Sequence, residues 1–224
     1  MALRIGCDLD GTLADLDTAF RREAERLFGG PADTAVSAIR QQRRLRTLWT
    51  HIGTIENFWT TLREAEPGAV AQLAAAARDG RWEVLFLTQR PATAGDTTQR
   101  QSHQWLEAHG FERPSVFVVS GSRGRIAASL DLHVVLDDRP QNCLDVLADS
   151  QATSILVWRQ RPERVPPGLA RLRIDVRYSM REAIDGLKQL ERTADTPQGM
   201  LHRVRHALRP LWRARRPSPS AINP

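Results

Sequence analysis

Cysteine and long apolar runs are scarce in this sequence, and each absence excludes a class of protein. The 224 residues include two cysteines, Cys7 and Cys143, which form no CxxC pair, so neither a disulfide framework nor a structural zinc site is expected. No run of about 18 apolar residues occurs, and no charged leader with an apolar core opens the chain, so neither a membrane span nor secretion is indicated. We therefore expect a cytoplasmic protein.

Acidic residues are absent from the C-terminal segment between Thr196 and Pro224, which contains six arginines. The remainder holds 26 basic and 26 acidic residues, so the whole net charge of +6 lies in this segment. We expect residues 193–224 to form a basic, flexible tail. Such a tail could bind an anionic partner, namely nucleic acid, a membrane surface or an acidic protein.

Short apolar runs alternate with helical patterns along the chain, which predicts a doubly wound, Rossmann-like α/β domain with a parallel sheet. A short strand near Asp175 and a helix over 179–191 are expected to complete this domain. The other strands are expected at 3–9, 83–88, 115–119, 133–137 and 153–158, and the helices between them at 67–79, 96–109, 123–130 and 140–149.

The first two predicted strands are too far apart for a simple crossover. Helical patterns at 15–28, 35–48 and 54–64 predict a small helical cap inserted after the first strand. We therefore assign residues 1–14 and 66–192 to the α/β core and residues 15–65 to the cap. Because ligands of doubly wound sheets bind beyond the carboxyl ends of the strands, the cap is expected to close over the site.

After Arg4, a short apolar run leads into the sequence Asp8-Leu9-Asp10-Gly11-Thr12. Residues two apart in a strand face the same side, so Asp8 and Asp10 can converge on one ion and one substrate. Gly11 permits the sharp turn that follows. Paired carboxylates at the exit of a buried strand indicate metal-assisted phosphoryl transfer.

Four motifs at predicted strand ends together resemble the haloacid dehalogenase-like superfamily. Asp8 and Asp10 match its first motif, and Thr88, which closes the run Val84 to Leu87, matches the hydroxyl of the second. Asp137 and Asp138 match the acidic fourth motif. The resemblance covers residues 3 to about 158 and implies a magnesium-dependent phosphoric monoester hydrolase.

The third motif of that superfamily normally supplies a lysine, and this sequence departs from that pattern. Its single lysine, Lys188, lies beyond the acidic pair. Arg123, at the start of a predicted helix, takes the corresponding place, and Arg125 is the second candidate. Arginine also holds phosphate and is always charged, so either residue preserves the chemistry.

The resemblance implies a role for each acidic residue. Mg²⁺ would be held by Asp8, by the backbone carbonyl of Asp10 and by Asp137, while Asp138 would orient its neighbours or contact the metal through water. Asp8 would attack phosphorus, and Asp10 would protonate the leaving oxygen and later activate water. Because the dehalogenase branch needs neither magnesium nor the second aspartate, Asp10 and the acidic pair argue against dehalogenation.

Two further segments are loosely similar to the 5'(3')-deoxyribonucleotidase branch. They are Phe58 to Leu62 before Pro67-Gly68, and Thr88 to Pro91. This similarity implies a nucleoside monophosphate as substrate. We expect Trp59, Arg90 and Arg125 to be substrate-binding residues. Trp49, Phe58 or Trp59 could stack on a base or could pack the cap.

Several alternatives stay open. The residues from Arg40 to Arg46 either form a solvated helix face or attract an anionic substrate. The chemistry also suits a phosphomutase or a sugar-phosphate phosphatase. The alternative outside the enzymes is a non-catalytic binding module with a tail that binds nucleic acid or membrane.

Overall fold

The computed structural model describes residues 2–29, 38–172 and 174–194, and six parallel strands form its sheet in the order β3-β2-β1-β4-β5-β6. The prediction of a doubly wound α/β sheet is confirmed. β1 lies in the centre, and its sides pair with β2 and β4, which explains why its sequence is a continuous apolar run. The strands are β1 Leu3–Asp8, β2 Trp82–Thr88, β3 Ser115–Val118, β4 Val134–Asp137, β5 Thr153–Val157 and β6 Asp175–Arg177.

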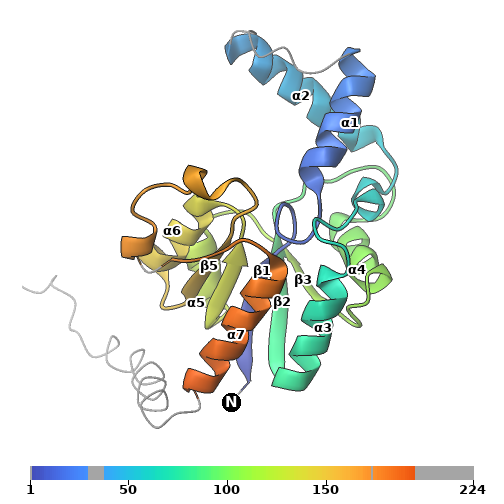
Figure 1. Cartoon of the computed structure of the whole chain (residues 1–224). Coiled ribbons are helices and arrows are strands. Elements are labelled where there is room, and N and C mark those ends of the chain that lie inside the picture. The colour runs from blue at the N-terminus through green and yellow to red at the C-terminus, as the bar shows by residue number, and fades with distance from the viewer. Residues whose placement is uncertain (1, 30–37, 173, 195–224) are drawn as a thin grey trace, which may run out of the picture. The chain divides into compact units, whose positions relative to one another are not determined.

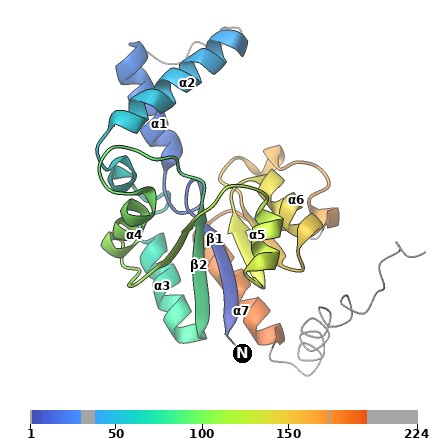
Figure 2. The ribbon, with the colours of Figure 1, turned by 180° about the vertical axis from the view of Figure 1, so that it is seen from behind.

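Helices cover both faces of this sheet (Figures 1 and 2). α3 Ala69–Gly80 and α4 Thr98–Ala108 lie on one face, and α5 Arg123–Ser129 and α6 Pro140–Asp149 lie on the other. The change of face coincides with the reversal of strand order beside β1, which in such sheets places a crevice at the carboxyl ends of the strands. Short 3-10 helices follow at Pro162–Arg164 and Ala170–Leu172.

α5 and α6 approach each other closely at Gly124. A Cβ atom at this position would lie 1.9 Å from the carbonyl oxygen of Asp145 in α6, so only glycine fits. Ser122 caps α5 by accepting a hydrogen bond from the backbone N–H of Arg125. The hydrogen bond between Ser122 and Arg125 and the close approach of α6 together set the position of Arg123, the first residue of α5.

Two helices are inserted after β1, α1 Leu16–Phe28 and α2 Ala38–Thr54, and they extend beyond the carboxyl ends of the strands (Figure 1). The side chain of Asp15 caps α1 through the backbone N–H of Thr18, 3.0 Å away. The predicted helix over 35–48 corresponds to α2, although residues 35–37 lie outside the described residues.

The third predicted cap helix, over 54–64, is wrong. A single 3-10 turn, η1 Phe58–Thr61, occupies that segment. Asn57 has a left-handed backbone (φ 50°), and the backbone N–H groups of Asn57 and Trp59 donate to Ala94 O and Gln101 Oε1 instead of to carbonyls one helical turn earlier. Contacts with the core therefore outweigh the local helical pattern.

The two connections between the cap helices and the core lie side by side. Ala14 and Glu64 form an isolated antiparallel bridge. The N–H of Asp15 donates to Arg63 O (2.9 Å), and the N–H of Ala65 donates to Leu13 O (2.7 Å). The chain thus leaves the core and returns to it through one hydrogen-bonded joint.

The chain divides into two compact units, Met1–Ile184 and Asp185–Pro224. α7 runs over Met180–Ala194, so the predicted tail, which begins at residue 193, is helical to Ala194 and lies outside the described residues from 195 onwards. The assignment of core, cap and tail stays a prediction. Among the described residues, no helix is long and apolar enough to cross a membrane.

Candidate active site

Three aspartates from two adjacent strands converge at the carboxyl edge of the sheet. Asp8 is the last residue of β1, Asp137 is the last residue of β4, and Asp138 follows directly. Each offers a carboxylate oxygen, and these oxygens lie within 4.8 Å of one another. Because β1 and β4 are parallel neighbours, the sheet itself brings the first and fourth motifs together.

Arg123 provides the positive charge among these carboxylates. Its Nη2 donates to Asp8 Oδ1 and to the carbonyl of Leu87 (3.2 Å), and its Nε donates to Asp137 Oδ2 (3.2 Å). The side chain is buried, and its Nη1 has no hydrogen-bond partner within the part of the chain that the structure describes. One N–H group of a buried guanidinium is thus left for a ligand.

The charges of the three carboxylates are not balanced by one arginine. Burial, and then the negative charge of Asp137, raise the pKa of Asp8 well above its usual value, although Arg123 opposes this effect. Burial also raises the pKa of Asp137. Burial and the charge of Asp137 raise the pKa of Asp138 to about 7. A bound cation would relieve the cost of ionising these groups.

The carboxylate of Asp138 is only partly satisfied by the described protein groups. Its Oδ1 is buried and has no hydrogen-bond partner among the described residues. Gly11 (φ 89°) makes space for this carboxylate, because a Cβ at residue 11 would lie 2.1 Å from Asp138 Oδ2. An unpartnered buried oxygen beside two further carboxylates is a donor set that suits Mg²⁺.

Asp137 is held by groups that sequence reasoning did not identify. Its Oδ1 accepts hydrogen bonds from the backbone N–H of Arg139 and from Asn142 Nδ2, each at 2.9 Å. Asn142 lies in the first turn of α6, just after Pro140. The sequence signal for Asn142 was an amide five residues after Asp137, with a proline between them that starts a helix.

Asp10 lies beside this cluster and is bound by Arg90 and Thr88. Nε of Arg90 lies 3.0 Å from both carboxylate oxygens of Asp10, and Nη2 lies 2.7 Å from Oδ1. The hydroxyl of Thr88 donates to Oδ2 at 3.3 Å. Nη1 of Arg90 donates to Ser102 Oγ (2.9 Å), so the guanidinium of Arg90 is bonded on both sides.

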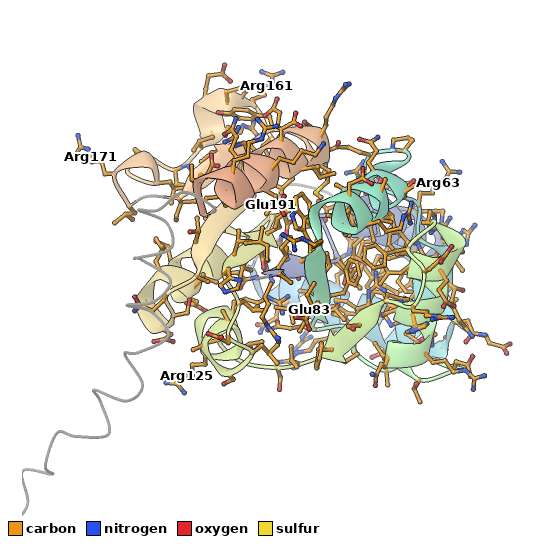
Figure 3. All side chains as sticks on the ribbon, turned by 90° about the horizontal axis from the view of Figure 1, so that it is seen from below. Arg63, Glu83, Arg125, Arg161, Arg171 and Glu191 are labelled. Atoms are coloured by element: carbon orange, nitrogen blue, oxygen red, sulfur yellow. The ribbon has the colours of Figure 1, made fainter. Side chains whose placement is uncertain are left out.

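Two other predicted substrate-binding residues have different environments. The side chain of Arg125 is 83% exposed, lies 3.8 Å from Asp149 and extends away from the ribbon (Figure 3). It does not line the pocket above the carboxylates. Trp59 does line that pocket, but it is fully buried and its indole N–H donates to Pro91 O at 3.0 Å. Of the two arginines that the sequence left open, Arg123 is the one beside Asp8.

The pocket above the carboxylates has a volume of about 400 Å³ and joins the core to the cap helices. Asp8, Asp10, Arg123, Asp138 and Asn142 form its polar side. Most of its apolar and aromatic lining comes from α1, α2 and η1, where Asp17 of α1 is the charged exception: Leu16, Phe20, Leu45, Trp49 and Trp59. The rings of Phe20 and Trp49 pack edge to face with centroids 4.4 Å apart.

Arg159, directly after β5 and Trp158, holds the loop that follows the first motif. Its Nε donates to Gly11 O (2.9 Å), its Nη2 donates to Thr12 O, and its Nη1 pairs with Glu66. Glu66 also accepts from the backbone N–H of Met180. Sequence reasoning missed Arg159, because a single arginine after a strand carries no motif; the structure identifies it as the residue that fixes the turn between Asp10 and the cap.

Replacement of Arg159 by Met is expected to lower kcat for phosphate-ester hydrolysis about 30-fold with little change in KM. The apolar stem is kept while two bonds to the loop and the pairing with Glu66 are lost, and small displacements of catalytic groups cost up to about 100-fold. Steady-state kinetics and thermal unfolding check this. Arg161→Met, an exposed residue two positions on, is the matched control; equal losses in both variants would contradict the assignment.

Comparison with known proteins gives matches to solved structures. No family model matches the chain, and no curated protein matches it. A HAD family hydrolase from Deinococcus radiodurans R1, crystallised with bound phosphate and sodium, is 18% identical over 84% of this chain and 96% of its own, with a TM-score of 0.56. A haloacid dehalogenase-like family protein from Streptococcus pneumoniae is 12% identical over 83% and 98%, with a TM-score of 0.53. The chain therefore has the fold of the haloacid dehalogenase-like hydrolases.

Proposed function

We propose that this chain is a magnesium-dependent phosphatase that hydrolyses a phosphate monoester through an aspartyl-phosphate on Asp8. The observation that carries the proposal is the cluster of Asp8, Asp137 and Asp138 around Arg123, whose Nη1 lacks a partner among the described residues. Such a site offers a nucleophile, a cation site and an anion-binding N–H group within one pocket.

Asp8, the backbone carbonyl of Asp10 and the acidic pair would hold Mg²⁺, with the unpartnered Oδ1 of Asp138 as the most available oxygen of that pair. When bound, the ion would act as a Lewis acid and screen the negative charge of the phosphoryl group. Arg123 would bind a phosphoryl oxygen through Nη1 and keep the nucleophile oriented through Nη2.

The reaction would proceed in two displacements. An oxygen of Asp8 attacks phosphorus, the ester P–O bond breaks, and the leaving alkoxide takes a proton from Asp10. Water then attacks the aspartyl-phosphate and gives a proton to Asp10, so inorganic phosphate leaves and Asp8 is restored. Arg90 and Thr88 hold the carboxylate of Asp10 in place for both proton transfers.

We propose a nucleoside monophosphate as the substrate. The polar side of the pocket suits the phosphate, and the wall of Phe20 and Trp49 suits a flat aromatic group at the other end of the ester. Trp49 is partly exposed and can contact a ligand, whereas Trp59 is buried, with its ring centroid 6.4 Å from that of Trp49.

Phosphate release from a panel of esters tests the proposal. Nucleoside monophosphates, sugar phosphates and a generic aryl phosphate are each incubated with the protein and Mg²⁺, with EDTA as the control. We expect magnesium-dependent turnover that is fastest for a nucleotide. Fastest turnover of a sugar phosphate would contradict the substrate; transfer of the phosphoryl group between two sugar positions without phosphate release would indicate a phosphomutase.

Replacement of Trp49 by Ala is expected to raise KM for the preferred nucleotide about tenfold, because base–aromatic stacking contributes about 1–3 kcal/mol. Turnover of glycerol phosphate, which has no ring to stack, should change less than twofold. Steady-state kinetics on both esters provide the check. An equal rise in KM for both esters would show that Trp49 supports the cap and does not contact a base.

A further inference from the structure

α2 has an unusual charge pattern for a solvent-facing helix. It contains four arginines and no acidic residue over Ala38–Thr54. The side chains of Arg43 and Arg46 are exposed, and neither has an acidic or aromatic partner among the described residues. Arg44 differs, because its guanidinium lies 5.0 Å from the ring centroid of Phe28. Within residues 2–29, 38–172 and 174–194, Arg43 and Arg46 therefore have no counter-charge.

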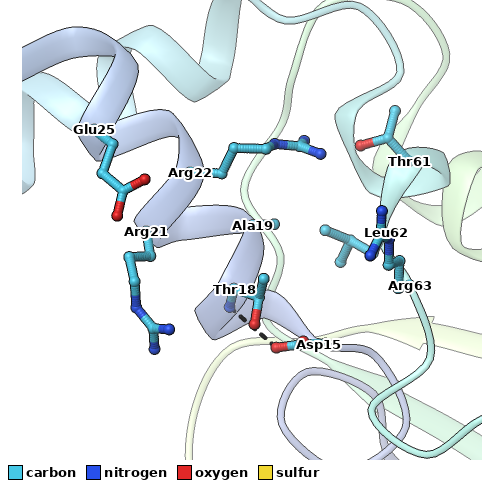
Figure 4. Close-up of a pocket in the computed structure, with 9 residues that line it drawn as sticks. All are labelled: Asp15, Thr18, Ala19, Arg21, Arg22, Glu25, Thr61, Leu62 and Arg63. Carbon is cyan, nitrogen blue, oxygen red and sulfur yellow. Dashed lines mark hydrogen bonds between the residues drawn. The ribbon is translucent and has the colours of Figure 1, made fainter.

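The arginines of the neighbouring helix α1 are used differently. Arg22 and Arg26 both pair with the buried Glu23, at 3.1 and 3.0 Å. Arg21 and Arg22 also line a separate pocket of about 250 Å³, in which Arg22 extends toward Thr61 and Arg63 (Figure 4). α1 thus carries an acidic residue that pairs with two of its arginines, whereas α2 carries no acidic residue over Ala38–Thr54.

The unpaired arginines of α2 lie in a row that begins at the active-site pocket. Leu45 and Trp49 of this helix line the pocket, and Leu48 and Ile52 are buried. At about 100° and 1.5 Å per residue, Arg46 lies about 60° around the axis from Trp49, and Arg43 lies a further 60° on. Each step moves about 4.5 Å along the helix. Trp49, Arg46 and Arg43 thus form one ridge that leads out of the pocket.

We propose that this ridge of α2 is a phosphodiester-binding surface, and that the substrate is a single-stranded nucleic acid whose terminal phosphate enters the pocket at Asp8. The proposal rests on the proposed function, which places a phosphoryl group beside Arg123. The terminal base would contact Trp49, and the next phosphates of the strand would contact Arg46 and Arg43. With this surface, the site would bind the end of a nucleic-acid strand and not only a mononucleotide.

A membrane surface fits this ridge less well. Membrane-bound amphipathic helices insert an apolar face, but Leu48 and Ile52 of α2 are buried and Leu45 and Trp49 line the pocket. Thr47, Thr50 and Thr54 are exposed on this helix. An acidic protein would satisfy the arginines but would leave the aromatic wall of the pocket without a role. The strand end accounts for the phosphate site, the aromatic wall and the arginines together.

Binding of a fluorescent dT12 strand with a 5'-phosphate tests the surface without turnover. The full chain with Asp8→Asn is titrated by fluorescence anisotropy between 50 and 200 mM KCl. Adding Arg43→Gln and Arg46→Gln is expected to weaken binding about tenfold at the lowest salt. The slope of log K against log[KCl] should fall by about 1.4, because each phosphate contact on a single strand contributes about 0.7.

The matched control is Arg161→Gln with Arg171→Gln, two exposed arginines of the core that extend outward in Figure 3. This pair should leave Kd and the slope unchanged, and both pairs share the same basic tail. Equal weakening by the two pairs, or the same α2-dependent binding of polyglutamate or anionic vesicles, would overturn the proposal.

Turnover by the chain with a native Asp8 separates this proposal from the proposed function. The ratio of kcat/KM for 5'-phosphorylated dT12 to that for thymidine monophosphate should fall about tenfold when Arg43 and Arg46 are replaced. If the mononucleotide is hydrolysed and the ratio is unchanged, the proposal that a strand end is the substrate is wrong. The proposed phosphatase activity is then still supported. If binding depends on α2 but no ester is hydrolysed, the proposed phosphatase activity is wrong. The proposal that a strand end is its substrate is then wrong as well.

Discussion

Replacement of Asp8 by Asn is expected to abolish phosphate release, with kcat lowered by at least about 10⁴-fold. Asn has nearly the shape of Asp, and its amide oxygen can still accept from Arg123 Nη2, but it cannot form an aspartyl-phosphate. The measurement is steady-state phosphate release with Mg²⁺ on the best ester of the panel. Asp79→Asn, an exposed carboxylate of α3, is the control and should retain full activity.

The stability of the same variant provides a second readout. Burial and the charge of Asp137 raise the pKa of Asp8, so the folded wild type bears an unfavourable charge once the pH exceeds that raised value. In EDTA at pH 8, Asp8→Asn should therefore have a higher Tm than the wild type, and the gap should narrow as the pH falls. Residual turnover within tenfold of wild type would contradict Asp8 as the nucleophile; a variant that is less stable at pH 8 would contradict the charge imbalance.

Replacement of Arg123 by Met is expected to have the largest effect on stability. The change leaves Asp8 and Asp137 buried without their shared cation, and removal of one partner from a buried ion pair costs about 3–5 kcal/mol. For a protein of this size that corresponds to a Tm lower by roughly 10 °C in EDTA. Activity should fall at least about 10³-fold, because the Nη1 group that we propose to bind the phosphate is lost as well.

Arg123→Lys separates the charge of Arg123 from its geometry. A lysine keeps the charge but cannot bond Asp8 and Asp137 with two fixed N–H groups, so we expect most of the stability and roughly 1–10% of the activity to return. Arg125→Met is the matched control, since this exposed neighbour on α5 does not line the pocket. A larger loss of activity in Arg125→Met than in Arg123→Met would reverse the assignment.

The parts of the fold that the sequence predicted well are those in which one pattern determines the outcome. Buried parallel strands require apolar runs, so β1 to β5 were predicted to within a residue or two at each end. The helix over 54–64 failed for the opposite reason. Its apolar residues have helical spacing, but Phe58 and Trp59 are buried and the backbone of this segment bonds to the loop after β2 and to α4. Tertiary contacts of this kind leave no local signal.

In the candidate site, too, features with a sequence pattern could be predicted, and features that depend on tertiary contacts could not. Asp8, Asp137 and Asp138 could be placed together because they end neighbouring parallel strands. The sequence could not distinguish Arg123 from Arg125, since both lie in the first turn of α5; which of them faces the sheet depends on the rotation of that helix, set by the contact at Gly124. Arg159 and Asn142 act by holding a loop carbonyl and a carboxylate, and such support depends on distances that only the folded chain provides.

The joint at Ala14 and Glu64 has a practical consequence for protein engineering. Because the two connections between the cap helices and the core are paired at this bridge, the ends of the inserted segment already face each other. Exchange of residues 16–61 would interrupt no strand of the sheet, provided that the new insert replaces the contacts that Asn57 and Trp59 make with Ala94 and Gln101. A library of such inserts on one unchanged set of aspartates would vary the ester that is accepted while the bond that is broken stays the same.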